Sequence, residues 1–393
     1  MNQPLKDILI LELSTMVTAS LASMMLAEQG ARVIKVEPQG TGDPMRLLGT
    51  SKGGISGLFA NCNRGKESIA LDLKQTAGQD IIRKLAAKAD ILVHNYRPGV
   101  MEQLNLGSDS LRAANPRLIY TAISGFGTTG PLANAPAYDP VVQAQAGFTS
   151  VQAAGGTADF MRTLICDKVT AYTACQGMTA ALYQRQLSGE GQHLDINMLD
   201  ASLFFLWPDG FMDHTLLDAD REIRPSIREA YKMHLTRDGG VTISAITDKQ
   251  IYGVFRAIDR EDLCDDERFS NPQARFQNLD VLNKLLKEKI ASMTTSELLT
   301  RLKAEDVPSA GSLSFDEVIN HPQIQANETL AVDTHPRMGQ MNLLRSPVNF
   351  KGKRLPLGSH CPALGEHTRP LLKEFGFAAQ LDELSKKGVI SPP

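Results

Sequence analysis

The distribution of apolar and polar positions along the first part of the chain predicts strands that alternate with helices. Residues 8–13 form a continuous apolar run of strand length, and residues 18–29 have helical spacing up to Gly30, which is well suited to end a helix. A second strand is predicted at residues 32–37. Because two parallel strands need a crossover connection, this β-α-β unit predicts a parallel sheet with a right-handed crossover.

The same alternation continues to about residue 200. Strands are predicted at residues 68–73, 90–95 and 116–124, and a helix at residues 75–89. Small residues then recur from Ala171 to about Gln186, which is typical of a helix that packs one face closely against another element. Together these elements predict an α/β fold built on a parallel sheet.

The pattern changes beyond about residue 220. Charged residues become more frequent, residues 241–245 alternate as an isolated strand, and helical patterns follow at residues 249–258 and 280–303. The tail contains several prolines and is expected to be extended up to residues 371–375. We therefore expect a large α/β domain, a smaller α+β domain and a tail that returns to the large domain, at residues 1–219, 220–325 and 326–393.

Composition narrows the class of protein. The 393 residues carry a net charge of −3, which gives no general case for nucleic-acid binding. The five cysteines are scattered without zinc spacing, so we expect no structural metal and a reducing, cytoplasmic location. No apolar run reaches membrane-spanning length. The first loop, residues 14–18, contains no glycine, which argues against binding of NAD or FAD.

Asp167 stands where a short apolar run meets the segment of small residues. At or next to the N-cap of the predicted helix, its carboxylate would accept backbone N–H bonds and interact with the positive end of the helix dipole. Both effects favour the ionised form, so we expect a carboxylate at neutral pH. From position alone, a capping role is the simpler interpretation, and a functional role depends on the surrounding motifs.

Seven motifs occur in order along nearly the whole chain. They are VIKVEPQGTGDPMR (33–46), NRGKESIALDLK (63–74), ADILVHNYRPGVMEQL (89–104), NPRLIYTAISGFGTTGP (115–131), AYDPVVQAQAGF (137–148), CDKVTAYTACQGMTAALYQRQLSGEGQHLDINMLDA (166–201) and LGEHTR (364–369). In this order and spacing they resemble the class III, or CaiB/BaiF, CoA transferases, which share a family with α-methylacyl-CoA racemase. The resemblance implies a Rossmann-like large domain that binds CoA, a small α+β domain and an interlocked homodimer.

The resemblance also assigns roles to particular residues. It implies that Asp167 is the nucleophile, that acyl-CoA esters and small carboxylates are the substrates, and that no cofactor is tightly bound. The CoA-binding positions that it implies lie in four loops, at Val17, Thr18, Leu71, Asp72, Leu73, Lys74, Asn95, Tyr96, Arg97 and Tyr138. Backbone amides at the start of the helix are expected to stabilise the oxyanions.

The chain departs from formyl-CoA transferase in several places. Val17-Thr18 replaces a Gln-Ala pair, and three basic residues are replaced by Pro38, Gln103 and Pro136. Because cationic side chains suit phosphates, other candidates for the CoA phosphates are Arg97, Arg64, Lys35 and Arg46. A glycine-rich flap over the oxalate site is missing, so formate and oxalate are not implied as substrates. The region that covers the site in relatives here contains Arg224, Arg228 and Lys232.

Two reactions remain open. The first moves CoA from a donor, with succinyl-CoA as one candidate, to a small carboxylic or dicarboxylic acid through an aspartyl anhydride and an aspartyl-CoA thioester. The second is the racemase reaction, whose branch carries a histidine immediately before the aspartate that matches Asp139. Here that position is Tyr138, and an ordinary tyrosine pKa of about 10 makes a poor base at neutral pH. A CoA-binding protein without activity is disfavoured because Asp167 is retained.

Overall fold

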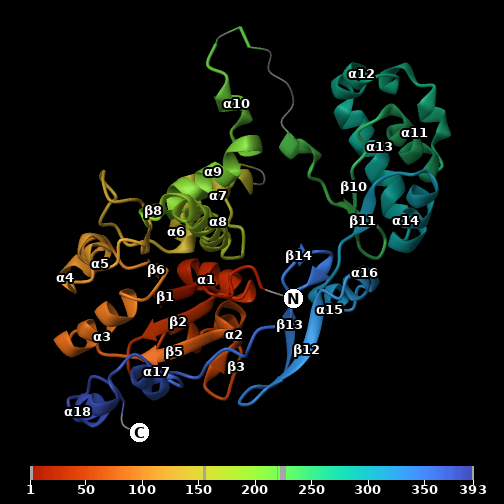
Figure 1. Ribbon diagram of the computed structural model, residues 1–393. Coiled ribbons are helices and arrows are strands. Elements are labelled where there is room, and N and C mark those ends of the chain that lie inside the picture. Colours follow the sequence, from red (N-terminus) through yellow and green to blue (C-terminus); the bar gives the residue numbers. More distant parts are fainter. Residues whose placement is uncertain (1–2, 154–155, 219, 222–226, 392–393) are drawn as a thin grey trace. The chain divides into compact units, whose positions relative to one another are not determined.

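The computed structural model describes residues 3–153, 156–218, 220–221 and 227–391 of the chain (Figure 1). The chain forms two compact units, which are described separately. One unit combines residues 1–208 with residues 327–393, and the other consists of residues 209–326.

The first unit is built on a six-stranded sheet in which every pair of neighbouring strands is parallel. The strand order is β5-β2-β1-β6-β7-β8. These strands are β1 (Leu9–Leu13), β2 (Arg32–Glu37), β5 (Lys66–Ala70), β6 (Ile91–His94), β7 (Ile119–Ser124) and β8 (His193–Asn197). The predicted α/β fold with a parallel sheet is therefore confirmed.

One face of the sheet is covered by α1 (Thr18–Glu28) and α8 (Ile165–Ser188), which pack against each other (Figure 1). Alanines let the two helices approach closely, since Ala19 and Ala22 of α1 share a buried cluster with Ala171 and Ala174 of α8. The predicted close packing of the small-residue helix is confirmed. This helix ends at Gly189, whose φ of 83° lies in the left-handed region that favours glycine.

The opposite face is covered by α3 (Thr76–Ala86), α5 (Ser108–Ala114) and elements of the tail. The tail helix predicted at residues 371–375 begins earlier, as α17 (Thr368–Glu374), and packs into the core through Leu371 and Leu372. A further helix, α18 (Leu381–Lys386), was not predicted. Its Leu381 and Leu384 are buried in the same cluster, so the C-terminal residues complete this layer.

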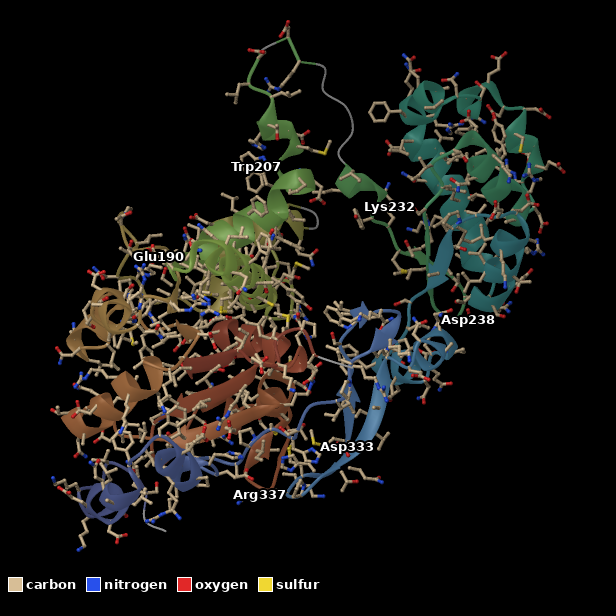
Figure 2. All side chains as sticks on the ribbon, in the orientation of Figure 1. Glu190, Trp207, Lys232, Asp238, Asp333 and Arg337 are labelled. Carbon is tan, nitrogen blue, oxygen red and sulfur yellow. The ribbon has the colours of Figure 1, made fainter. Side chains whose placement is uncertain are left out.

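Short elements connect the main layers of this unit. Those before β8 are η1 (Pro44–Leu47), β3 (Ser51–Lys52), β4 (Ile55–Ser56), α2 (Gly57–Asn63), α4 (Val100–Gln103), α6 (Asp139–Ala146) and α7 (Phe148–Val151). Helix α9 (Met198–Gly210) follows β8 and runs into the second unit. The tail adds β12 (Leu330–His335), β13 (Gly339–Leu344), β14 (Asn349–Phe350), β15 (Lys353–Arg354) and η5 (Ala378–Gln380). Figure 2 marks the β12–β13 hairpin by Asp333 on β12 and Arg337 in the turn.

The second unit contains an antiparallel sheet with the order β11-β10-β9. The strands are β9 (His234–Leu235), β10 (Gly240–Ile243) and β11 (Ser309–Gly311), so the strand predicted as isolated at residues 241–245 is in fact central. Its helices are α10 (Met212–Thr215), η2 (Ile227–Ala230), α11 (Asp248–Ala257), η3 (Glu261–Cys264), η4 (Glu267–Phe269), α12 (Pro272–Gln277), α13 (Leu279–Ser292), α14 (Thr295–Ala304), α15 (Phe315–Ile319) and α16 (Pro322–Ala326). The helical pattern at residues 280–303 is therefore divided between two helices.

The described residues contain neither a membrane-crossing helix nor a cluster of metal-ligating side chains. No helix among them is both long and apolar enough to cross a membrane. Nor does this part of the chain bring together three or more metal-ligating side chains. The five cysteines are free thiols.

Candidate active site

The loops that leave the carboxyl ends of the parallel strands carry the predicted site residues. Residues 14–18 follow β1, residues 95–97 follow β6, residues 71–74 follow β5, and Tyr138 lies in the connection after β7. In a parallel sheet all these ends meet at one edge, where α/β proteins bind ligands. Because neighbouring strands are about 4.8 Å apart, the loops after β1 and β6 adjoin, and the loop after β5 is roughly 10 Å from β1.

Asn95 holds the first loop in place. Its Nδ2 donates to the carbonyl oxygen of Thr15 (2.6 Å) and to Oγ1 of Thr18 (3.0 Å), and its Oδ1 accepts the Thr15 N–H (3.1 Å). The N–H of Met16 donates to Oδ1 of Asp43 (3.1 Å), and Met16 has a φ of 61°, in the left-handed region. The structure thus brings the predicted residues Thr18 and Asn95 together, and both shape the loop.

The other predicted CoA residues differ in what they can offer a ligand. Val17 and Leu71 are buried, and Leu73 and Tyr96 pack partly buried against the core. Asp72 accepts hydrogen bonds from the N–H of Lys74 and from Gln75 within its own turn. Within the described part of the chain, three predicted side chains are exposed and have no polar partner, those of Lys74, Arg97 and Tyr138.

For three of the four cationic side chains, the predicted binding of the CoA phosphates is wrong. Lys35 is fully buried, with Nζ 2.7 Å from Glu12 and 2.9 Å from Asp43. Arg46 donates to both carboxylate oxygens of Glu37, at 2.8 and 2.7 Å. Arg64 is buried against Glu28, with 2.6 Å between Nε and Oε1. Each guanidinium or ammonium group is therefore used inside the protein, and only Arg97 remains a candidate by exposure.

Asp167 is the third residue of α8, three positions after the N-cap residue, whereas it was expected at or next to the N-cap. Leu164 is the N-cap residue, and no side chain caps the helix there. Leu164 packs against the hydrophobic cluster that contains Val17, so the start of α8 lies beside the first loop. The Asp167 side chain belongs to a residue that is only 8% exposed, which places its carboxyl group in a largely dry environment.

Asp139 contacts the start of α8, and sequence reasoning did not predict this contact. It is the first residue of α6 and is 2% exposed. Its Oδ2 accepts the backbone N–H of Asp167 (3.0 Å), and its Oδ1 accepts Nε2 of Gln143 (2.6 Å). The available signal was Asp139-Pro140, a favourable start for a helix, followed by Gln143 one turn later.

Two expectations about Asp167 are corrected by this geometry. Burial, together with the negative charge of Asp139, raises the pKa of Asp167 to about 7, whereas a lowered value was expected. The N–H of Asp167 is occupied by Asp139, so this amide does not serve as an oxyanion donor. The carboxyl group is therefore poised between its two protonation states near neutral pH.

Three basic residues lie in the region that covers the site in relatives. Two of them are described and belong to the second unit. Arg224 lies outside the described residues. Arg228 has Nη2 4.0 Å from Oδ2 of Asp213. Lys232, labelled in Figure 2, is exposed. Binding of an acceptor carboxylate by Arg228 or Lys232 stays a prediction.

Comparison with known proteins shows the family to which the chain belongs. A profile of CoA-transferase family III matches residues 5–368. The acetyl-CoA:oxalate CoA-transferase of Acetobacter aceti is 32% identical over 95% of this chain and 96% of its own length. The succinate–glutarate CoA-transferase of Agrobacterium fabrum is 31% identical, with 95% and 96% covered. The crystal structure of a CAIB/BAIF family protein from Brucella suis matches with a TM-score of 0.83 and 28% identity, covering 95% of this chain and 100% of that one. The chain therefore belongs to CoA-transferase family III and is an enzyme that transfers CoA.

Proposed function

We propose that the enzyme moves CoA from a donor acyl-CoA to a small carboxylic or dicarboxylic acid, and that Asp167 carries the acyl group and then the CoA. The observation that carries this proposal is the Asp167 carboxyl group itself. It is buried beside the first loop, it has no cationic partner among the described residues, and its pKa of about 7 leaves a reactive carboxylate present at neutral pH.

The first half of the reaction forms two intermediates in turn. An Asp167 carboxylate oxygen attacks the thioester carbonyl of the donor, and the C–S bond breaks so that its electron pair leaves with the CoA thiolate. The product is an acyl-aspartyl anhydride. The thiolate then attacks the aspartyl carbonyl carbon, which releases the donor acid as a carboxylate and leaves an aspartyl-CoA thioester.

The second half repeats these steps with the acceptor. The acceptor carboxylate attacks the aspartyl-CoA carbonyl and displaces the thiolate, which gives a new anhydride. The thiolate attacks the acceptor acyl carbon of this anhydride, so product acyl-CoA forms and the Asp167 carboxylate is regenerated. CoA held by its nucleotide end keeps the thiolate at a high effective concentration throughout. The burial of Asp167 supports the exclusion of water that both intermediates need.

The exposed side chains at the sheet edge support CoA binding there. Arg97 and Lys74 offer cationic heads that suit phosphate groups, and Tyr138 presents a ring that is 66% exposed next to Asp139. Relatives named for oxalate and for glutarate support a dicarboxylate as the acceptor class. We infer that succinyl-CoA is a suitable donor, since relatives are also named for succinyl-CoA.

A second copy of the chain is the expected partner. Large apolar side chains are exposed on α8 and α9, including Tyr183 (69%), Leu187 (72%) and Phe204 (83%). A contiguous exposed apolar surface usually marks an interface. We infer that this surface is covered in an interlocked homodimer. Sedimentation equilibrium at micromolar concentration tests this, since a monomeric mass would contradict the interlocked architecture.

The activity is tested with a panel of free acids. The protein is incubated with succinyl-CoA or acetyl-CoA and each acid, and mass spectrometry identifies new acyl-CoA esters. We expect transfer to at least one small dicarboxylate. The racemase alternative predicts a different result in deuterated water, namely exchange of the α-proton of a 2-methylacyl-CoA without transfer between acids.

A further inference from the structure

Asp139 is a buried acid whose hydrogen-bond donors among the described residues are both uncharged groups. It is 2% exposed, and in the described part of the chain its carboxylate accepts the N–H of Asp167 and the amide of Gln143. A buried carboxylate is normally compensated by a cation, as Glu12 is by Lys35 and Lys66 in the same unit. Neither hydrogen-bond partner supplies a cation, so the charge of Asp139 acts on the nearby Asp167 carboxyl group.

The same carboxylate fixes the position of Asp167. Its bond to the Asp167 N–H ties the first turn of α8 to the first turn of α6. Gln143, one turn along α6, donates to the carbonyl oxygens of Met161 and Thr163 and accepts the Met161 N–H, each at 3.1 Å. The two residues together hold both the start of α8 and the loop that enters it.

Among the described residues, no cation is paired with Asp139 or Asp167. The described titratable groups on the elements that pack against α8 pair elsewhere or are neutral, and the nearest cation on α8 donates to a threonine (2.7 Å). On the packed elements these groups are Glu28 of α1, which pairs with Arg64, Tyr120 of β7, and His193 and Asp195 of β8, which face each other. On α8 itself they are Cys166, Lys168, Tyr172, Cys175, Tyr183 and Arg185, of which Arg185 pairs with Asp90.

We propose that Asp139 is a positioning residue for Asp167: it aligns the nucleophile through a backbone hydrogen bond and favours the covalent intermediates by charge repulsion. This role rests on the proposed function. Before reaction the two carboxylates repel each other. When the Asp167 oxygen bonds to the acyl carbon and the thioester electron pair leaves on the CoA sulfur, Asp167 becomes neutral and the repulsion ends. The negative charge is thereby moved from the buried pair to the thiolate, which favours acylation.

The test measures kcat/KM against pH for wild type and for Asp139→Asn, which keeps an acceptor oxygen but removes the charge. We expect the wild-type rate to rise with pH along a limb centred near pH 7 and to level off above it, because the carboxylate form attacks. In Asp139→Asn this limb should move down by roughly one pH unit, and kcat above the limb should fall roughly three- to tenfold. Asp139→Glu keeps the charge and should keep the limb near its wild-type position even where kcat falls.

Gln143→Met is the matched control, since it loosens the same loop without changing any charge. It should lower kcat and leave the limb where it is in wild type. Should Asp139→Asn not fold, Asp139→Ser supplies an acceptor oxygen in a smaller side chain and is expected to show the same shift. An unmoved limb in the folded, charge-free variant would overturn the role of Asp139. Failure of the proposed function is distinguishable, because wild type itself would then show no transfer.

Discussion

Two buried carboxylates of the first unit, Glu12 and Asp167, lie in opposite electrostatic environments. Glu12 is completely buried, and its two oxygens are each 2.7 Å from a lysine, Lys35 or Lys66. Burial alone would raise the pKa of Glu12, but the charges and hydrogen bonds of the two lysines hold it well below its usual range. For Asp167, burial and the charge of Asp139 raise the pKa to about 7.

The difference separates a group that builds the fold from a group available for chemistry. The oxygens of Glu12 accept bonds from three serines as well as the lysines, and Lys35 also donates to the carbonyl oxygen of Ser14 in the first loop. Glu12 thereby joins the first loop to α1, β2 and β5. Within the described residues Asp167 has no such set of partners, and an uncompensated buried acid next to a ligand-binding edge is typical of a reactive site.

Removing the proposed nucleophile should give the largest effect. Asp167→Ala and Asp167→Asn should reduce transfer by roughly three powers of ten or more, because a covalent step is lost, while the affinity for CoA stays nearly unchanged. Steady-state assays and calorimetric titration with CoA measure both quantities. Asp109→Asn, at an exposed position on α5, is the control and should keep normal activity. A near-normal rate for Asp167→Ala would show that another residue carries the group.

Removing the structural acid should instead affect stability. Glu12→Gln should lower the free energy of unfolding by roughly 3–5 kcal/mol, because Lys66 loses its acidic partner while remaining buried. Urea unfolding measures the change. Glu383→Gln removes an exposed partner of Lys387 and should change the same quantity far less, because water screens an exposed ion pair. Equal effects of the two variants would contradict the assignment of Glu12 as a buried anchor.

Ionisation of Asp167 should lower the free energy of unfolding as the pH rises. The folded pKa of Asp167 is about 7, above the value of about 3.9 expected in the unfolded chain, so ionisation disfavours the folded state. The penalty is absent below about pH 4 and complete above about pH 7. Asp167→Asn should therefore be more stable than wild type at about pH 8, by at most roughly 4 kcal/mol, with a smaller difference at about pH 5.

Urea unfolding at both pH values measures this difference, with Asp109→Asn as a surface control. A difference between variant and wild type that is the same at both pH values would contradict the raised pKa.

The smallest effect is expected at the neighbouring thiol. Cys166 is fully buried, and burial raises the pKa of its thiol to about 12, so it stays protonated and unreactive. Cys166→Ala should keep kcat within about threefold of wild type, since the side chain only packs against its surroundings. Loss of activity as deep as that of Asp167→Ala, measured in the same assay, would make Cys166 part of the chemistry.

Local patterns were sufficient to predict the fold class and the helix that carries Asp167. Apolar runs at residues 8–13 and 32–37 gave two parallel strands, and the alanines of the later segment gave the helix that packs against α1. These features depend on residues close in sequence. Helix α18 was missed because its burial depends on a core formed largely by residues 11–120.

The electrostatics of the site could not be predicted in the same way. Lys35 looked available to phosphates because its pairing with Glu12 depends on the register of β1 and β2. Asp167 looked ionised because a helix start favours a carboxylate, and the contact with Asp139 across 28 residues was not visible. In both cases tertiary structure brings in the deciding partner. Lys35 is paired inside the protein instead of being free for phosphates, and the pKa of Asp167 is raised instead of lowered.

Covalent trapping tests the central claim most directly. Wild-type protein is incubated with a donor acyl-CoA and then with hydroxylamine, which attacks activated acyl groups, and the digested peptides are analysed by mass spectrometry. The account predicts a hydroxamate on the peptide that contains Asp167, formed only when acyl-CoA is present. A hydroxamate on a different residue, or transfer of CoA between acids with no label at Asp167, would contradict it.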